Sequence, residues 1–249
     1  MLGIASLPEI NTPKRQKGNR SMCRVDGCYR ASAKFSHLCE YHRNVNRVHG
    51  DPRQSGVTKT ELKPYQNAIR EYLARRSGPS AEAVIRKDWG RVAGRAEEFL
   101  EAANRGRPHN VHERRAAQII VSVGKNYHAM EIAILCMALG YFYAAQPRRW
   151  ASERGFQYQA ARMLRRLAQG ETDYTWRPEG TMVRSSAKRC PPLVTRALWS
   201  SIEATNFIGY GIQISREIEK GRELKRKDRI ADLREILGAG AFAVKSEAA

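Results

Sequence analysis

Acidic residues are scarce in this chain of 249 residues: 25 Asp and Glu stand against 44 Lys and Arg, so the formal net charge is +19. Net charge does not determine a fold, but a charge of this size favours polyphosphate as the partner. The basic residues are spread over the whole sequence and not along one face of an amphipathic helix, which disfavours an anionic membrane. We therefore expect nucleic acid, and no membrane, as the partner.

Long hydrophobic runs are also missing. The longest, residues 129–145, is interrupted by Glu131 and contains Gly140, so we predict a buried helix there and not a membrane span. The first seven residues are too few for the apolar part of a secretory signal, and the charges follow them. Cysteine is sparse as well: five residues, an odd number, favour a reducing compartment and metal binding over disulfides.

Motifs that mark an enzyme are weak. No Gly-rich loop suited to cradling phosphate is present. One polar cluster deserves a test as a metal nuclease site: His109, Asn110, His112 and Glu113. It falls between two helical patterns, without the strands that a ββα-metal nuclease needs. Cys136 lies in the most apolar segment and is predicted to pack, while Cys190 has no identifiable His partner. We predict no catalytic residue, with a metal-dependent nuclease or replication-initiation protein as the alternative.

What is present, first, is a set of four zinc donors with the spacing Cys-x4-Cys-x10-Cys-x2-His: Cys23, Cys28, Cys39 and His42. Two close pairs separated by a loop supply the tetrahedron that zinc requires. Gly27 permits a tight turn between the first pair, and the second pair begins a short helix through Val48. His37 is the alternative ligand, but its spacing argues against it. Since protein fills all four positions, we predict a structural zinc.

Residues 23–52 resemble the small zinc-binding module of many phage and mobile-element proteins, including some HNH homing endonucleases. The matching residues, in order, are Leu38, Cys39, His42, Arg43, Arg47, Gly50, Asp51 and Pro52. The usual Gly before Leu38 is replaced by His37. The resemblance covers about an eighth of the chain. It implies zinc, nucleic-acid contact through residues such as Arg43 and Arg47, and a phage or mobile-element origin, but no activity. We expect the protein in the cytoplasm of a bacterial host cell, associated with the nucleoid.

A second constellation lies at residues 147–169, which we predict to form two helices joined by a turn. Ala151 is the small residue in the first helix and Gly155 the turn residue with positive φ. The apolar positions that would join the helices are Phe156, Ala161, Leu164 and Leu167. The segment resembles a helix-turn-helix of the lac repressor type, with Arg154 as a departure. The alternative is an ordinary helix pair with a solvated basic face.

If the helix-turn-helix is present, it assigns DNA contacts. The residues expected on the exposed start of the recognition helix, facing base edges, are Gln157, Tyr158, Gln159 and Arg162. The residues expected at phosphates are Arg148, Arg149, Arg165 and Arg166. A β-wing is predicted over residues 174–183, with Arg177 and Arg184 aimed at the DNA backbone.

The whole sequence predicts a mainly α-helical protein with a small N-terminal zinc-binding module. The predicted parts are a disordered basic arm (1–21), the zinc module (22–53), a linker (54–60) and a helical body (61–249) with the helix-turn-helix, either plain or winged. Helices are expected over residues 64–76, 80–104, 111–123, 127–144, 193–219 and 222–237. The leading function is site-specific binding of duplex DNA by a transcription regulator whose surplus helical surface contacts RNA polymerase or another host protein. An RNA-binding or virion nucleoprotein is the further alternative. The oligomeric state stays open.

Overall fold

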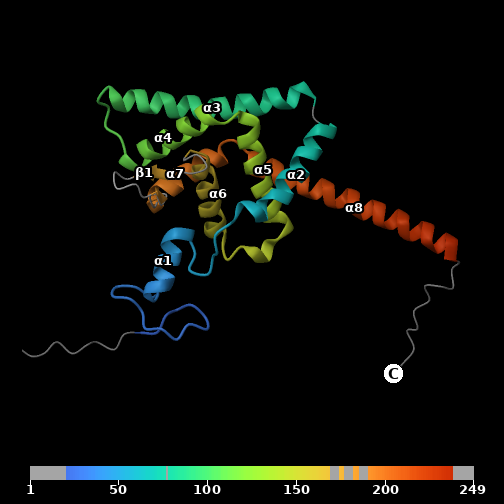
Figure 1. Cartoon of the computed structure of the whole chain (residues 1–249), viewed down its shortest axis with the longest axis horizontal. Helices are drawn as coiled ribbons and strands as arrows, with labels where there is room; N and C mark the ends of the chain where they lie inside the picture. The colour runs from blue at the N-terminus through green and yellow to red at the C-terminus, as the bar shows by residue number, and fades with distance from the viewer. Residues whose placement is uncertain (1–20, 77, 169–173, 177–181, 185–189, 238–249) are drawn as a thin grey trace, which may run out of the picture.

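The computed structural model describes residues 21–76, 78–168, 174–176, 182–184 and 190–237, and this part of the chain is mainly helical (Figure 1). The helices are α1 (Glu40–His49), α2 (Lys59–Arg76), α3 (Pro79–Asn104), α4 (Val111–Asn126), α5 (Ala129–Ala145), α6 (Glu153–Ala168), α7 (Pro192–Glu203) and α8 (Phe207–Leu237). A short 3-10 helix, Pro147–Arg149, precedes α6. Strands β1 (Tyr174–Trp176) and β2 (Met182–Arg184) pair antiparallel, with Thr175 opposite Val183. The mainly helical class with an N-terminal Cys/His cluster is confirmed.

Helix α5 forms the centre of the core because it is apolar all round. Every residue from Ile132 to Phe142 is buried, as expected for a helix with neighbours on all sides. It contacts α2, α3, α6 and α8, while α4 packs on α3, α6 and α7. In the part of the chain that the structure describes, no single helix has the length and hydropathy of a membrane span; α4 and α5 meet that test only jointly, across a bend of 117°.

Helices α5 and α8 approach each other closely through glycine. A Cβ atom on Gly140 would overlap the carbonyl oxygen of Ile208, and one on Gly211 would overlap that of Met137. Only glycine allows two backbones to come this near. Beyond this contact α8 leaves the body and projects outward (Figure 1), and Leu224 on the projecting part is 62% exposed.

The prediction for the C-terminal helices is wrong in where they break. A break was expected near residue 220, between helices over 193–219 and 222–237. The break lies instead at residues 204–206, and α8 continues through Gly221. Asn206 adopts a left-handed φ of 58°, and the Thr205 hydroxyl accepts the amide of Phe207 at 3.3 Å. Asn tolerates this conformation better than most residues, whereas a glycine inside a helix costs only about 1 kcal/mol. The polar pair therefore ends α7, and Gly221 does not end α8.

Helix α2 begins five residues before the predicted start, inside the segment expected to be a linker. Thr58 and Glu61 form a reciprocal cap: the Thr58 amide donates to the Glu61 carboxylate at 2.8 Å, and the Glu61 amide donates to the Thr58 hydroxyl at 3.1 Å. Pro64 thus lies inside the helix and not in its first turn. Before the cap, Gln54 and Val57 are each 1% exposed, so these two side chains pack against the body.

Candidate metal centre and the basic surface beside it

The four predicted donors, Cys23, Cys28, Cys39 and His42, come together at the N-terminal end of the described chain. Their ligand atoms all lie within 4.8 Å of one another. His42 Nδ1 is 3.3 Å from the Cys23 Sγ and 3.4 Å from the Cys39 Sγ, and the Cys28 and Cys39 sulfurs are 3.9 Å apart. Tetrahedral zinc with its usual bond lengths needs edges of about 3.5–3.8 Å. The donor set therefore fits a metal ion, as the sequence spacing predicted.

The local backbone explains why these donors converge. Gly27 has φ +74°, and the Cys28 amide donates to the Val25 carbonyl at 3.0 Å, which closes the predicted tight turn. Cys39 is the N-cap of α1, so the His42 ring rises from the first turn of that helix. His37, the alternative ligand, is exposed and lies outside the cluster.

Within the cluster, Cys23 favours thiolate, the form that binds metal. Burial by itself raises the pKa of the Cys23 thiol. Hydrogen bonds from the backbone at Cys39 and Val25, and from the His42 and Cys28 side chains, outweigh this effect and lower the pKa to about 6. The Cys23 sulfur is thus prepared to lose its proton near neutral pH. A backbone hydrogen bond at Arg30 lowers the pKa of Cys28, but burial and the neighbouring Cys23 and Cys39 side chains outweigh it and raise that pKa.

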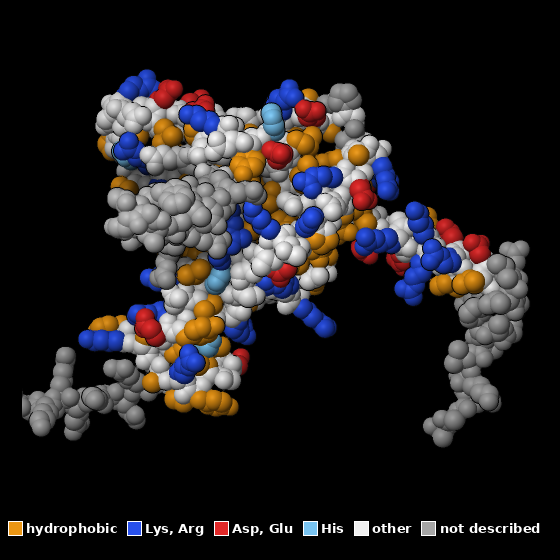
Figure 2. Space-filling model, viewed as in Figure 1, with side chains coloured by type: hydrophobic (Ala, Val, Ile, Leu, Met, Phe, Trp, Pro, Cys, Tyr) orange, Lys and Arg blue, Asp and Glu red, His pale blue; other side chains and the backbone are white. Residues whose placement is uncertain are grey.

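The module presents aromatic side chains to solvent, a feature that the sequence analysis missed. Phe35 is 96% exposed, Tyr29 86% and Tyr41 59%. Cations lie over two of these rings: the Lys34 ammonium is 5.1 Å from the Phe35 ring centre, and the Arg30 guanidinium 5.5 Å from that of Tyr41. In Figure 2 the module, at the lower left, carries apolar and basic side chains together on its outer surface. The signal in the sequence was the pairing of aromatic with basic residues in Tyr29-Arg30 and Lys34-Phe35.

The helix-turn-helix predicted at residues 147–169 is not confirmed by residues 147–168, which the structure describes. One short 3-10 helix is followed by a continuous α6, and Gly155 lies within α6 without a positive φ. A Cβ added to Gly155 would lie 2.9 Å from Gln54 Oε1, and the same oxygen accepts the Ala151 amide at 3.0 Å. The small residue at position 155 therefore makes room for Gln54, not for a turn.

Two of the predicted base-reading side chains are buried, so the expected exposure of Tyr158 and Gln159 is wrong. Gln159 is 0% exposed; its Oε1 accepts the Val57 amide at 3.0 Å and its Nε2 donates to His49 Nδ1 at 2.9 Å. Tyr158 packs its ring against Gly50. Gln157 is half-buried, within 3.5 Å of the Glu153 carboxylate. This face of α6 holds the end of the metal module instead of facing solvent.

His49 lies at the centre of this junction, and the sequence analysis did not single it out. Both Gln159 Nε2 and Arg162 donate to His49 Nδ1, the latter at 3.1 Å. The accepting nitrogen must be unprotonated, so the imidazole is neutral. Burial, followed by the charges of Arg162, Arg149 and Arg166, lowers the pKa of His49. The junction is therefore built for neutral histidine.

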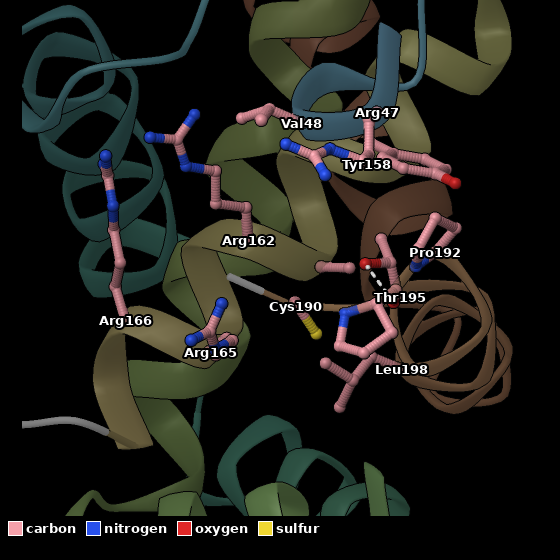
Figure 3. Close-up of a pocket in the computed structure, with 12 residues that line it drawn as sticks. Arg47, Val48, Tyr158, Arg162, Arg165, Arg166, Cys190, Pro192, Thr195 and Leu198 are labelled. Carbon is pink, nitrogen blue, oxygen red and sulfur yellow. Dashed lines mark hydrogen bonds between the residues drawn. The ribbon is translucent and has the colours of Figure 1, made fainter. Parts of the chain in front are cut away.

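The arginines predicted to contact DNA lie in several different surroundings. Arg149 is half-buried and engaged internally: it pairs with Glu61 at 3.2 Å and donates to the Gly56 carbonyl at 3.0 Å. Arg43 is exposed beside Glu40, at 2.7 Å, and Arg148 is exposed. The remaining arginines line one cavity between α1, α6 and α7 (Figure 3): Arg47, Arg162, Arg165 and Arg166. Arg177 lies outside the described residues, as does the Arg184 side chain.

The polar cluster near residue 110 is explained by local structure. Asn110 caps α4, and its side chain accepts the His112 amide at 2.9 Å. His109 Nδ1 is 3.0 Å from the Arg107 carbonyl. Within the described ranges, the Cys3His group is the one cluster of side chains arranged to hold a metal. Cys136 is 2% exposed in the core, and burial raises its pKa to about 12.

No family model, curated protein or solved structure matches this chain.

Proposed function

We propose that the chain is a zinc-containing nucleic-acid-binding protein that grips duplex DNA with its metal module and the adjoining basic surface. The donor set favours zinc because three thiolates and one imidazole in a tetrahedron suit its softness and geometry. Protein donors complete the coordination, so the metal would organise the module and leave no open position for chemistry. The resemblance of residues 23–52 to a phage and mobile-element module supports the same proposal.

The observation that carries the proposal is the outer surface of the module. Phe35, Tyr29 and Tyr41 stand in water beside Arg30 and Lys34. Large exposed aromatic residues cost free energy unless a partner covers them. Cations beside them attract phosphate, and an exposed aromatic ring can wedge between the base steps of a duplex. Phe35 also takes a φ of 59°, which is rare for a bulky residue and holds the ring at the tip of its loop.

The more specific predictions about function are not equally well supported. Site-specific reading by a recognition helix has lost its basis, because Gln159 and Tyr158 are buried. Regulation of transcription in a phage or mobile element, and nucleoid association in a bacterial host, continue to rest on the module's resemblance. Contact with RNA polymerase or another protein rests on surplus helical surface, of which the projecting part of α8 is the plainest example.

Fluorescence anisotropy with a labelled 30-base-pair duplex tests the proposal. We expect zinc-loaded protein to bind, the affinity to fall steeply with salt as counterions are released, and chelated protein to bind at least about tenfold more weakly. Competition with single-stranded DNA and with RNA, at physiological salt, identifies the preferred nucleic acid. Binding that is indifferent to both salt and metal would contradict the proposal.

Phe35→Ala isolates the module surface. Loss of a ring that wedges between base steps predicts about tenfold weaker binding. Leu224→Ala is the matched control, because Leu224 is also an exposed large apolar residue, at 62%, but lies on the projecting part of α8. Equal effects from the two substitutions would show that the module tip has no special role.

A further inference from the structure

A cavity of about 380 Å³ lies where the end of α1 meets α6 and the start of α7 (Figure 3). Its size falls within the range of small-molecule sites. It lies between the metal module and the helical body, because Arg47 and Val48 come from α1 whereas Thr195 and Leu198 come from α7. None of these residues belongs to the metal cluster.

The lining of this cavity is cationic without compensation. Four arginines reach it: Arg47, Arg162, Arg165 and Arg166. Among the described residues that line it, no carboxylate is present. Arg162 is half-buried and donates to neutral His49 at 3.1 Å. Burial, followed by the charges of Arg166 and Arg165, lowers the pKa of Arg162. Like charges held together at a partly buried surface repel one another, and an anion between them relieves that repulsion.

Part of the cavity wall is apolar. Tyr158, Pro192 and Leu198 line it, together with Val48 and Ala161. A bare inorganic anion gains nothing from such a wall. A ligand that carries both a phosphate and a flat, weakly polar group uses the arginines and the apolar lining together, because arginine forks bind phosphate and rings pack on aromatic and apolar surfaces.

We propose that this cavity binds one nucleotide, with its phosphate between Arg162 and Arg165 and its base against Tyr158 and Pro192. The inference deepens the proposed function, on which the choice of a nucleotide rests. The nucleotide comes either from solution as a free mononucleotide or from a nucleic-acid strand that enters the cavity. The chemistry of recognition is the same for both sources.

Cys190 provides a direct probe of occupancy. Its partly exposed side chain lines the cavity, whereas three of the other cysteines form the metal cluster and Cys136 is buried. In zinc-loaded full-length protein, a thiol-alkylating reagent should therefore modify Cys190 first, as peptide mass spectrometry will show. We expect saturating deoxynucleoside monophosphates to slow this modification about tenfold, and inorganic phosphate or an unphosphorylated deoxynucleoside at the same concentration to slow it far less.

Arg165→Gln tests the assignment of the phosphate. Removing one charge-assisted hydrogen bond should weaken mononucleotide binding about tenfold by calorimetry. Arg226→Gln removes the same charge from the exposed part of α8 and should leave that affinity unchanged. Circular dichroism confirms that both variants are folded.

The outcomes separate this inference from the proposed function. If no mononucleotide protects Cys190, or inorganic phosphate protects it equally well, the cavity proposal is overturned, whether or not duplex DNA still binds in the anisotropy assay. Protection by mononucleotide alone supports a free nucleotide as the source. Protection by mononucleotide and also by a single-stranded oligonucleotide, at lower concentration for the oligonucleotide, supports a strand.

Discussion

At the scale of single residues, Gly50 shows how tightly the metal module is fixed to the body. It caps α1 with φ +82°, and a Cβ there would lie 2.7 Å from the Tyr158 ring. Gly50→Ala should therefore lower the free energy of unfolding by about 2–4 kcal/mol, through backbone strain plus the clash. Gly106→Ala is the control, because Gly106 has φ +87° with nothing within 4 Å; it should cost only about 1 kcal/mol. Equal losses in urea denaturation would rule out the Tyr158 contact as the cause.

His49 predicts a pH dependence of stability. Its folded pKa lies below the unfolded value of about 6.5, so the unfolded state takes up its proton first as the pH falls. Stability that is fully present above pH 6.5 is therefore lost as the solution is acidified through the folded pKa. His49→Gln keeps an acceptor for Gln159 and Arg162 but cannot titrate. Urea denaturation between pH 7.5 and 5.5 should show a shallower loss in the variant, while acid loss of metal affects both proteins alike. Parallel curves would refute the assignment.

At the scale of elements, α5 and α8 can cross closely only because the residues at their contact include glycines, which have no side chain. A Cβ on Gly211 would overlap the Met137 carbonyl oxygen, whereas one on Gly221 would meet nothing within 4 Å. Gly211→Ala should cost about 3 kcal/mol or more, since backbone has to move. Gly221→Ala should instead stabilise the protein by about 1 kcal/mol, because alanine is the better helix former. Thermal unfolding of the two variants checks the opposite signs; a matching sign would disprove the packing argument.

Some features of these elements could be predicted from local sequence patterns, and others could not. The apolar run of α5 and the donor spacing of the metal cluster are local patterns, and both were predicted. The role of Gly155 was not, because glycine suits either a turn or a close contact, and only the fold shows that Gln54 occupies the space beside it. Gln159 was taken for an exposed base-reading side chain since its partners, Val57 and His49, lie 102 and 110 residues away in the sequence. Contacts at that separation leave no local signature.

At the scale of the whole molecule, two structural units with different sources of stability meet at one junction. The body has a core centred on the fully buried α5. The module buries little: α1 contains no buried residue, and Cys23 and Cys39 are the metal donors among its few buried side chains. We expect a segment with so little apolar burial to depend on a bound metal, which supplies roughly 10–16 kcal/mol in comparable sites. We expect no such dependence for the body.

Removal of the metal should therefore unfold the module and spare the body. In Cys39→Ser, or after chelation, we expect metal content to fall from one ion per chain, rapid proteolysis within residues 21–50, and a small loss of helical circular dichroism that matches α1 alone. Cys136→Ser is the control, since this thiol is buried in the core away from the cluster; it should keep the metal. Because Gln54, Val57 and Gly50 pack on α6, some stability of the body depends on the docked module, and its melting temperature should drop by a few degrees. Complete unfolding of the body on chelation would mean that the junction, and not the α5 core, holds the molecule together.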